Sequence, residues 1–220
     1  MIKAKRSGRV NLSERAYNQI KDALCEGKII PGDILSESQL AEEMNMSRTP
    51  VREALRALAS EDWLEIKNGI GAYVKPLSSK DMEDLYEIRC LLEVQAAKTS
   101  VYHITNAEID VLERQFRDLL EEYESGNTPE PQRFSALDWE LHELIVERGQ
   151  NNYIKVIMRN NNTNMRRYQV LSAEALNDIK TSILQHLDIL ALLRSRDVNA
   201  VTDALQRHLI WASGILKHVQ

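Results

Sequence analysis

The sequence predicts a mainly α protein in two parts. An N-terminal winged helix-turn-helix, with three helices and a two-stranded wing, is followed by an all-helical bundle of about six helices. One observation behind this prediction is a pair of short strand-like runs that ends the first 76 residues. Another is that strand-like alternation is absent, and Gly and Pro are rare, from Lys80 onward. A hydrophobic content of 43% is enough to fill a core in each part.

The first two helices are predicted from caps and apolar spacing. The first should run from an N-cap at Ser13 to about Gly27, since glycine commonly ends a helix. After the turn 31–32, a capping box made by Ser36 and Gln39 should open the second helix. The apolar stripes consist of Ala16, Ile20, Ala23 and Leu24 in the first helix and Leu40, Ala41 and Met44 in the second.

A third helix follows after a very short turn. Ser47 is a suitable N-cap, and Pro50 falls in the first turn, where its missing N–H costs nothing. Its predicted buried face consists of Val51, Ala54, Leu55 and Leu58. Two helices joined by so short a turn form a helix-turn-helix.

Two strand-like runs, 64–66 and 72–74, follow the third helix. The residues between them include Gly69 and Gly71, which permit a tight hairpin, and this hairpin would be the wing. Beyond a short linker at 76–79, the remaining chain is predicted to be helical. We expect helices at about 80–102, 106–125, 132–148, 152–171, 176–195 and 198–218.

The predicted domain organisation follows from these elements and from the charge distribution. Residues 1–10 should form a flexible basic arm that either lies along phosphates or is a solvated tail. The arm is followed by a DNA-binding domain at 11–75 and by the linker at 76–79. An effector-binding and dimerisation domain is expected at 80–220. The net charge of -5 argues against nucleic-acid binding, but residues 1–76 hold twelve Lys or Arg against eleven Asp or Glu.

Several classes of protein are excluded by composition. An apolar run of roughly 20 residues, as needed to cross a bilayer, is absent, and so is the apolar core of a signal peptide. A cytoplasmic protein without a membrane partner is therefore expected. Cys25 and Cys90 lie 65 residues apart, which leaves neither a CxxC metal site nor a disulfide framework.

The third helix has the residues of a DNA-reading helix. Arg48 and Thr49 lie at its start, and Arg52 and Arg56 extend the same face, opposite the apolar residues. A recognition helix contacts base edges with its N-terminal residues, and arginine can bind guanine with two hydrogen bonds. The partner would be double-stranded DNA. The alternative for any single arginine is a surface salt bridge.

The run LAEEMNMSRTPVREALRAL, over residues 40–58, resembles the helix-turn-helix signature of GntR-family bacterial regulators. The preceding Pro31-Gly32-Asp33 turn and the wing are also similar to that family, so the resemblance covers residues 11–75. It implies that Ser47 binds phosphate and that Asn68 and Gly69 at the wing tip contact DNA. One departure is that Ser38-Gln39 stand before Leu40, where many relatives have an arginine.

Histidines in the C-terminal part indicate a metal site. Asp138 and His142 are four residues apart and so share one helix face. His186 and His208 each lie eleven residues from Asp197, so a helix hairpin at Asp197 would set them level with each other. This ligand set suits a divalent ion, with Zn²⁺ the first choice and Ni²⁺ or Mn²⁺ as alternatives. Alternatively, these are ordinary helix residues.

Residues 80–220 resemble the all-helical FCD effector domain of the FadR-type branch of the same family, and the six helices resemble its VanR-like subgroup. The segment LYEIRCLLE at 85–93, the Asp138-x-x-x-His142 motif and the two later histidines carry the resemblance. It implies a metal site, at which Arg89 would help to hold the carboxylate of a small organic acid. Alternatively, Arg89 pairs with Glu93 one turn later. Asn161 and Asn164 could line the pocket or lie on an exposed face.

These expectations describe a ligand-responsive bacterial transcription regulator, more commonly a repressor, that binds a palindromic operator as a homodimer. A small organic acid at the metal site would control it. One alternative is the same regulator with a metal-free pocket. Another is a metal-dependent hydrolase, because one Asp and three His could also activate water. An enzyme is not expected, since a separate general base is missing and the DNA-reading part would have no purpose.

Overall fold

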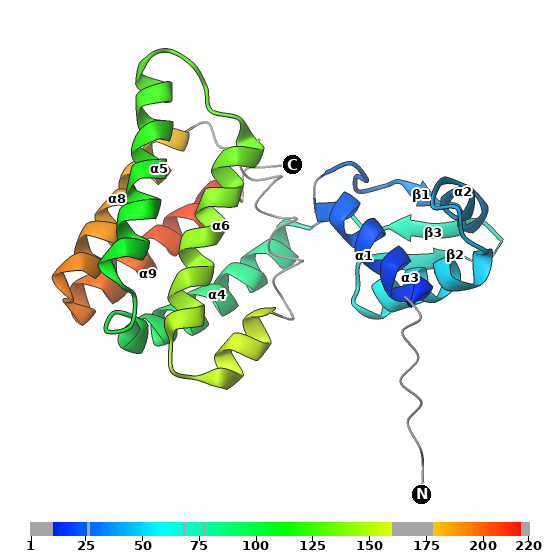
Figure 1. Cartoon of the computed structure of the whole chain (residues 1–220), viewed down its shortest axis with the longest axis horizontal. Helices are drawn as coiled ribbons and strands as arrows, with labels where there is room; N and C mark the ends of the chain where they lie inside the picture. Colours follow the sequence, from blue (N-terminus) through cyan, green and yellow to red (C-terminus); the bar gives the residue numbers. More distant parts are fainter. Residues whose placement is uncertain (1–10, 26, 68, 77, 160–177, 217–220) are drawn as a thin grey trace, which may run out of the picture. The chain divides into compact units, whose positions relative to one another are not determined.

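The computed structural model describes residues 11–25, 27–67, 69–76, 78–159 and 178–216 (Figure 1). The predicted basic arm, Asn68, Asn161 and Asn164 lie outside the described residues. The chain forms two compact units, Met1–Pro76 and Leu77–Gln220.

The N-terminal unit contains three helices and a small sheet. The helices are α1 (Leu12–Cys25), α2 (Glu37–Glu43) and α3 (Arg48–Ser60), and the strands are β1 (Ile34–Leu35), β2 (Leu64–Lys67) and β3 (Gly71–Val74). The strands pair antiparallel in the order β1-β3-β2. The core of this unit is built around the fully buried side chains of Ile20, Leu55, Leu58, Trp63 and Leu64.

The wing has one strand more than predicted. β1 pairs with β3, Ile34 opposite Tyr73 and Leu35 opposite Ala72, so the two-stranded wing expected from the sequence is part of a three-stranded sheet. A strand of two residues is too short for alternation to reveal it. Its position depends on contacts with residues far along the chain, such as the amide of Val74, which donates to the carbonyl of Asp33 at 2.8 Å.

The predicted caps in this unit need correction. Ser13 is not the N-cap of α1, because its own amide donates to the side chain of Asn11 at 3.2 Å. Ser36 does precede α2, but its hydroxyl contacts that of Ser38 at 2.9 Å and makes no capping hydrogen bond. The capping box of Ser36 and Gln39 is therefore not formed, and the Ser36 hydroxyl pairs with Ser38 instead.

The C-terminal unit is a helical bundle. It contains α4 (Ser79–Ser100), α5 (Asn106–Glu124), α6 (Pro131–Arg148), a helical stretch at 152–159, α8 (Ile179–Ser195) and α9 (Val198–Leu216). Helix α4 packs on α6 and α9, α5 packs on α8, and α8 packs on α9. Among the described helices, none is both long enough and apolar enough to cross a membrane.

The described helix ends in this unit fall within a few residues of the prediction, because local signals fix them, whereas the predicted boundaries at 171, 176 and 218 lie outside the described residues. Thr105 and Glu108 form a full capping box at the start of α5. Arg196, in the left-handed conformation with φ 61°, ends α8, and α9 begins two residues later. The expected hairpin at Asp197 is thus present, and α8 and α9 lie side by side (Figure 1).

Candidate functional site

Helix α3 keeps its apolar side in the core and its arginines outside. Val51, Leu55 and Leu58 are at most 1% exposed, whereas Arg48, Arg52 and Arg56 are all exposed. Ser47 and Thr49, at the start of the helix, are exposed as well. The residues predicted to contact DNA therefore lie together at the N-terminal end and along one face of this helix.

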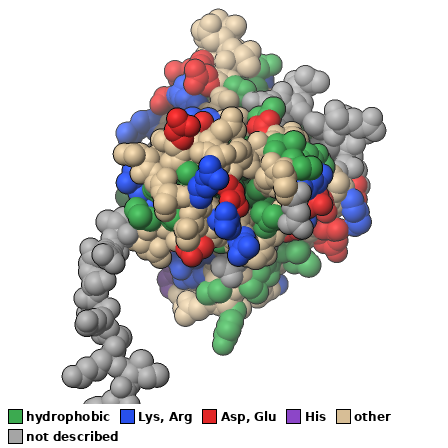
Figure 2. All heavy atoms as spheres, turned by 90° about the vertical axis from the view of Figure 1, so that its right-hand side faces the viewer, with side chains coloured by type: hydrophobic (Ala, Val, Ile, Leu, Met, Phe, Trp, Pro, Cys, Tyr) green, Lys and Arg blue, Asp and Glu red, His purple; other side chains and the backbone are tan. Residues whose placement is uncertain are grey.

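A groove of about 500 Å³ runs between α2, α3 and the wing. Its lining includes Arg48, Arg52, Arg56, Lys67, Gly69 and Glu37. Four cationic side chains against one carboxylate give this groove a positive balance, which suits a phosphate-rich partner. On the face of the N-terminal unit shown in Figure 2, Lys and Arg side chains are interspersed with Asp and Glu.

Arg52 has an acidic partner that sequence reasoning did not assign. Its Nε donates to both carboxylate oxygens of Glu37 at 3.0 Å, and its Nη2 lies 2.8 Å from Oε2. The hydrogen bonds from Arg52 lower the pKa of Glu37. Both side chains are partly exposed, so this pair adds little stability and instead orients the guanidinium within the groove.

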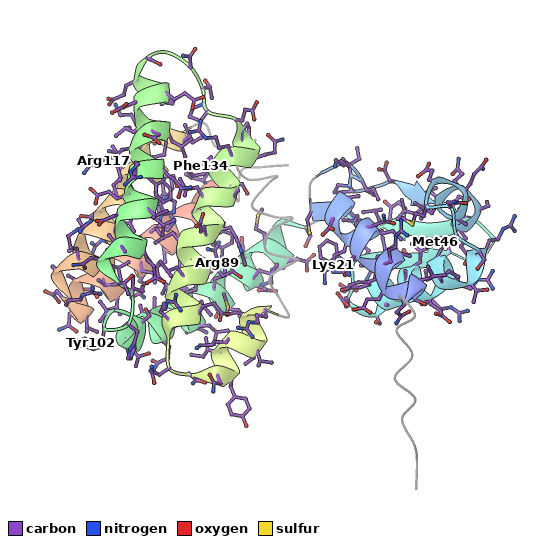
Figure 3. The ribbon with its side chains drawn as sticks, viewed as in Figure 1. Lys21, Met46, Arg89, Tyr102, Arg117 and Phe134 are labelled. Carbon is purple, nitrogen blue, oxygen red and sulfur yellow. The ribbon has the colours of Figure 1, made fainter. Side chains whose placement is uncertain are left out.

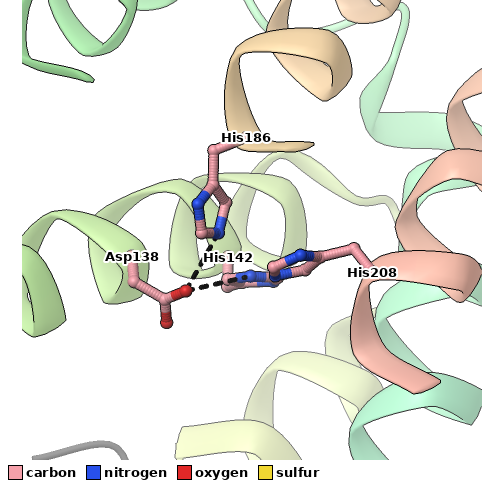
Figure 4. Close-up of side chains that lie close together, drawn as sticks. All are labelled: Asp138, His142, His186 and His208. Atoms are coloured by element: carbon pink, nitrogen blue, oxygen red, sulfur yellow. Dashed lines mark ion pairs between the residues drawn. The ribbon is translucent and has the colours of Figure 1, made fainter. Parts of the chain in front are cut away.

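Four potential metal ligands meet in the C-terminal unit. Asp138 and His142 come from α6, His186 from α8 and His208 from α9 (Figure 4). One donor atom from each lies within 4.8 Å of the others, and the imidazoles of His186 and His208 have ring centroids 4.4 Å apart. The donor atoms around a tetrahedral ion such as Zn²⁺, each about 2.0–2.1 Å from the metal, are about 3.3 Å apart. This cluster could therefore hold a metal ion after small side-chain shifts.

In two of the histidines Nδ1 has a hydrogen-bond partner outside the cluster, so Nε2 is the nitrogen that remains for a metal ion. Nδ1 of His142 lies 2.5 Å from Oε2 of Glu93, and Nδ1 of His208 lies 2.7 Å from Oε1 of Gln185. Nε2 of His142 is buried and has no hydrogen-bond partner among the described residues. An engaged Nδ1 and a free Nε2 are typical of a metal-binding histidine.

His186 is held differently. Its ring stacks on Phe116, with centroids 4.8 Å apart and planes at 18°. Its Nε2 lies 2.9 Å from Oδ1 of Asp138, which is an ion-pair distance, and neither ring nitrogen makes a hydrogen bond within the described part of the chain. Both atoms can act as metal ligands, and a metal ion bound by both would stabilise their close approach.

The charge states of the cluster suit a metal. Burial would raise the pKa of Asp138, but His142, His186 and Arg89 outweigh it and hold that pKa well below the ordinary range. Burial lowers the pKa of His186 and, more strongly, that of His208. Near neutral pH this leaves an ionised carboxylate and neutral imidazoles at these positions, which is the protonation state that binds a metal.

Arg89, labelled in Figure 3, makes the ion pair that the sequence offered as the alternative to ligand binding. Its Nε donates to Oε1 of Glu93 at 2.7 Å, and both side chains are buried. Burial would raise the pKa of Glu93, but Arg89 and His142 outweigh it and lower that pKa to about 2. Nη2 of Arg89 is buried without a hydrogen-bond partner among the described residues.

Sequence reasoning missed three residues near these sites. Glu93 was considered only as a partner for Arg89, although a charged pair among apolar residues on one helix face is a recognisable signal. Gln185 and Glu37 gave no signal, since their partners lie on other helices. Asn161 and Asn164, predicted to line the pocket, fall outside the described residues, as does Asn68 at the wing tip.

Comparison with known proteins gives two family matches that together span most of the chain. Residues 12–74 match the family described as bacterial regulatory proteins, gntR family, and residues 84–210 match the FCD domain. The chain is 34% identical to the Nta operon transcriptional regulator of Aminobacter aminovorans, over 76% of each chain. It is 32% identical to the gluconate operon transcriptional repressor of Bacillus subtilis, over 77% of this chain and 68% of the relative.

A solved structure supports the same fold. E. coli McbR/YncC aligns with a TM-score of 0.76 at 23% identity, covering 94% of this chain and 98% of the other. At that identity the likeness concerns the arrangement of helices and strands, which is shared across both units.

Proposed function

Because this chain belongs to the GntR family of bacterial regulatory proteins and carries an FCD domain, we propose how this transcriptional regulator is controlled. A small organic acid binds at a divalent metal ion in the C-terminal unit and changes the affinity of the N-terminal unit for its operator. Zn²⁺ is the first choice of ion, with Ni²⁺ and Mn²⁺ as alternatives.

The observation that carries this proposal is the cluster of Asp138, His142, His186 and His208. Its donor atoms lie within 4.8 Å of one another, and its three histidines are at most 3% exposed. Nε2 of His142 and both ring nitrogens of His186 are buried without a hydrogen-bond partner among the described residues, which is costly unless a ligand supplies one.

A carboxylate is the ligand class that the surroundings favour. An ion held by these four protein ligands would accept carboxylate oxygens by taking five or six ligands in all, which suits Ni²⁺ and Mn²⁺ and requires Zn²⁺ to expand beyond four. Nη2 of Arg89, which has no hydrogen-bond partner within the described residues, is a donor suited to the same group. Asn161 and Asn164 are further candidates from the sequence, and they lie outside the described residues.

On the DNA side, we propose that Arg48, Thr49, Arg52 and Arg56 read the major groove. Ser47 binds a phosphate, and Asn68 and Gly69 at the wing tip contact the minor groove or the backbone. The exposure of the arginines and the positive groove between α3 and the wing support this assignment. A palindromic operator bound by a homodimer follows from the few base pairs that one such helix covers. One relative is named an operon repressor, which supports repression.

The test is whether a carboxylate changes operator affinity only when metal is present. Operator DNA would first be selected by the protein from a random-sequence library. Its affinity would then be measured with metal-loaded and chelator-treated protein, with and without a panel of carboxylates that includes gluconate. We expect one panel member to shift the affinity by about 5–150-fold, and only in the loaded protein. An equal shift in the chelated protein would favour a metal-free pocket, and no shift with any carboxylate would contradict the proposal.

A further inference from the structure

We propose that Glu93 is a positioning residue for the candidate metal site, and that it fixes His142 as a ligand through Nε2. This inference rests on the proposed function only in requiring that the cluster binds a metal. The contact between Glu93 and His142 and the ion pair of Glu93 with Arg89 are described by the structure, and the residues lie on two helices that pack together, α4 and α6.

The contact between these residues is close and fully enclosed. Oε2 of Glu93 lies 2.5 Å from Nδ1 of His142, with Glu93 0% and His142 2% exposed. An ionised carboxylate can only accept a hydrogen bond, so Nδ1 of His142 must donate the proton. In the neutral imidazole, the lone pair is then on Nε2, which has no hydrogen-bond partner in the described structure and lies 3.8 Å from Oδ1 of Asp138, another residue of the cluster.

Arg89 completes this arrangement from the other side. Its Nε holds Oε1 of Glu93 at 2.7 Å, so the carboxylate bridges a guanidinium and an imidazole. A buried carboxylate without such a partner would be strongly disfavoured, and the ion pair keeps it as an acceptor directed at His142. Arg89 therefore acts on the candidate site through Glu93, in addition to any contact that its Nη2 makes with a ligand.

Two histidines of the cluster can be compared by their partners at Nδ1. His208 donates from Nδ1 to Gln185, whose amide oxygen is neutral, whereas His142 donates to an anion. An anionic acceptor makes the imidazole a stronger base and hence a stronger metal ligand. The two histidines thus differ in the charge of the group that accepts the hydrogen bond from Nδ1. We therefore expect the partner of His142 to add more to metal affinity than the partner of His208 does.

The experiment uses the full-length protein and the variant Glu93→Gln, which keeps the side-chain size and removes the charge. Glu143→Gln is the matched control, because Glu143 is exposed on α6 next to His142 and contacts Trp139. Zn²⁺ affinity is measured by competition with a chromophoric chelator, and folding is checked by circular dichroism. We expect Glu93→Gln to weaken Zn²⁺ binding by about 10–100-fold and Glu143→Gln to leave it unchanged.

A second readout needs no metal. Nitrogen-15 NMR of the chelator-treated wild type should show His142 with its proton on Nδ1, and Glu93→Gln should raise the population of the Nε2–H form. If Glu93→Gln does not fold, the position of the His142 proton in the wild type still tests the inference. A proton on Nε2 of His142 in the wild type, or Zn²⁺ binding that Glu93→Gln leaves unchanged, would overturn the inference. Failure of this inference can be told apart from failure of the proposed metal site, because without a metal site the wild type itself would bind no Zn²⁺.

Discussion

At the scale of single residues, the candidate metal site joins four side chains from α6, α8 and α9 with a carboxylate, Glu93, from α4. Asp138 and His142 share a helix face because they are four apart, and the hairpin at Asp197 sets His186 and His208 level. Glu93 could not be assigned to His142 in advance, since their contact joins residues 49 apart in the chain. Such pairs depend on how α4 and α6 pack, and one sequence without packing information does not specify that.

The arginines of α3 offer the first test at this scale. Arg48→Ala and Arg52→Ala should each weaken operator binding by about 1–3 kcal/mol if each side chain contacts a base. Affinities are measured at one fixed salt concentration, because phosphate contacts depend strongly on salt. Arg117→Ala is a suitable control, since it removes an exposed arginine from α5 in the other unit. Operator affinity unchanged in both α3 variants would refute their assignment.

At the scale of elements, helices were easier to predict than the sheet. Apolar periodicity and caps placed α4, α5 and α6 within two residues of their observed ends. Sequence reasoning did not predict strand β1, because two residues are too few to show the alternation of apolar and polar residues that marks a strand. Its pairing with β3 depends on contacts between residues far apart in the chain. The same pairing gives Gly71 a role beyond the hairpin turn.

Gly71→Ala should destabilise the N-terminal unit. Gly71 has φ +140°, and a Cβ there would lie 2.6 Å from the carbonyl oxygen of Leu35 in β1, so strain and a backbone clash combine. We expect a loss of about 1–3 kcal/mol in the free energy of unfolding, measured by urea denaturation. Gly69→Ala is the matched control from the same hairpin, because φ is +78° but no described atom lies within 4 Å of the new Cβ. Equal losses in the two variants would mean that contact with β1 contributes nothing.

At the scale of the whole molecule, the chain combines a unit with exposed arginines and a unit with a buried polar cluster. The net charge of -5 for the whole chain does not indicate a DNA-binding unit. The more basic character of the N-terminal part appears only when the charges of the two parts are counted separately. The four cluster residues span positions 138 to 208, so the cluster exists only when α6, α8 and α9 are packed. Metal binding should therefore stabilise the folded C-terminal unit as well as create the ligand site.

The most direct test of the account is the metal content of purified protein, measured by mass spectrometry beside His186→Ala and His208→Ala. His103→Ala is the control, because His103 is exposed and does not belong to the cluster. The account predicts about one ion per chain in the wild type and in the control, and loss of the ion in both cluster variants. No ion in the wild type, even after incubation with Zn²⁺, Ni²⁺ and Mn²⁺, would contradict the metal site and leave the DNA-binding assignment intact.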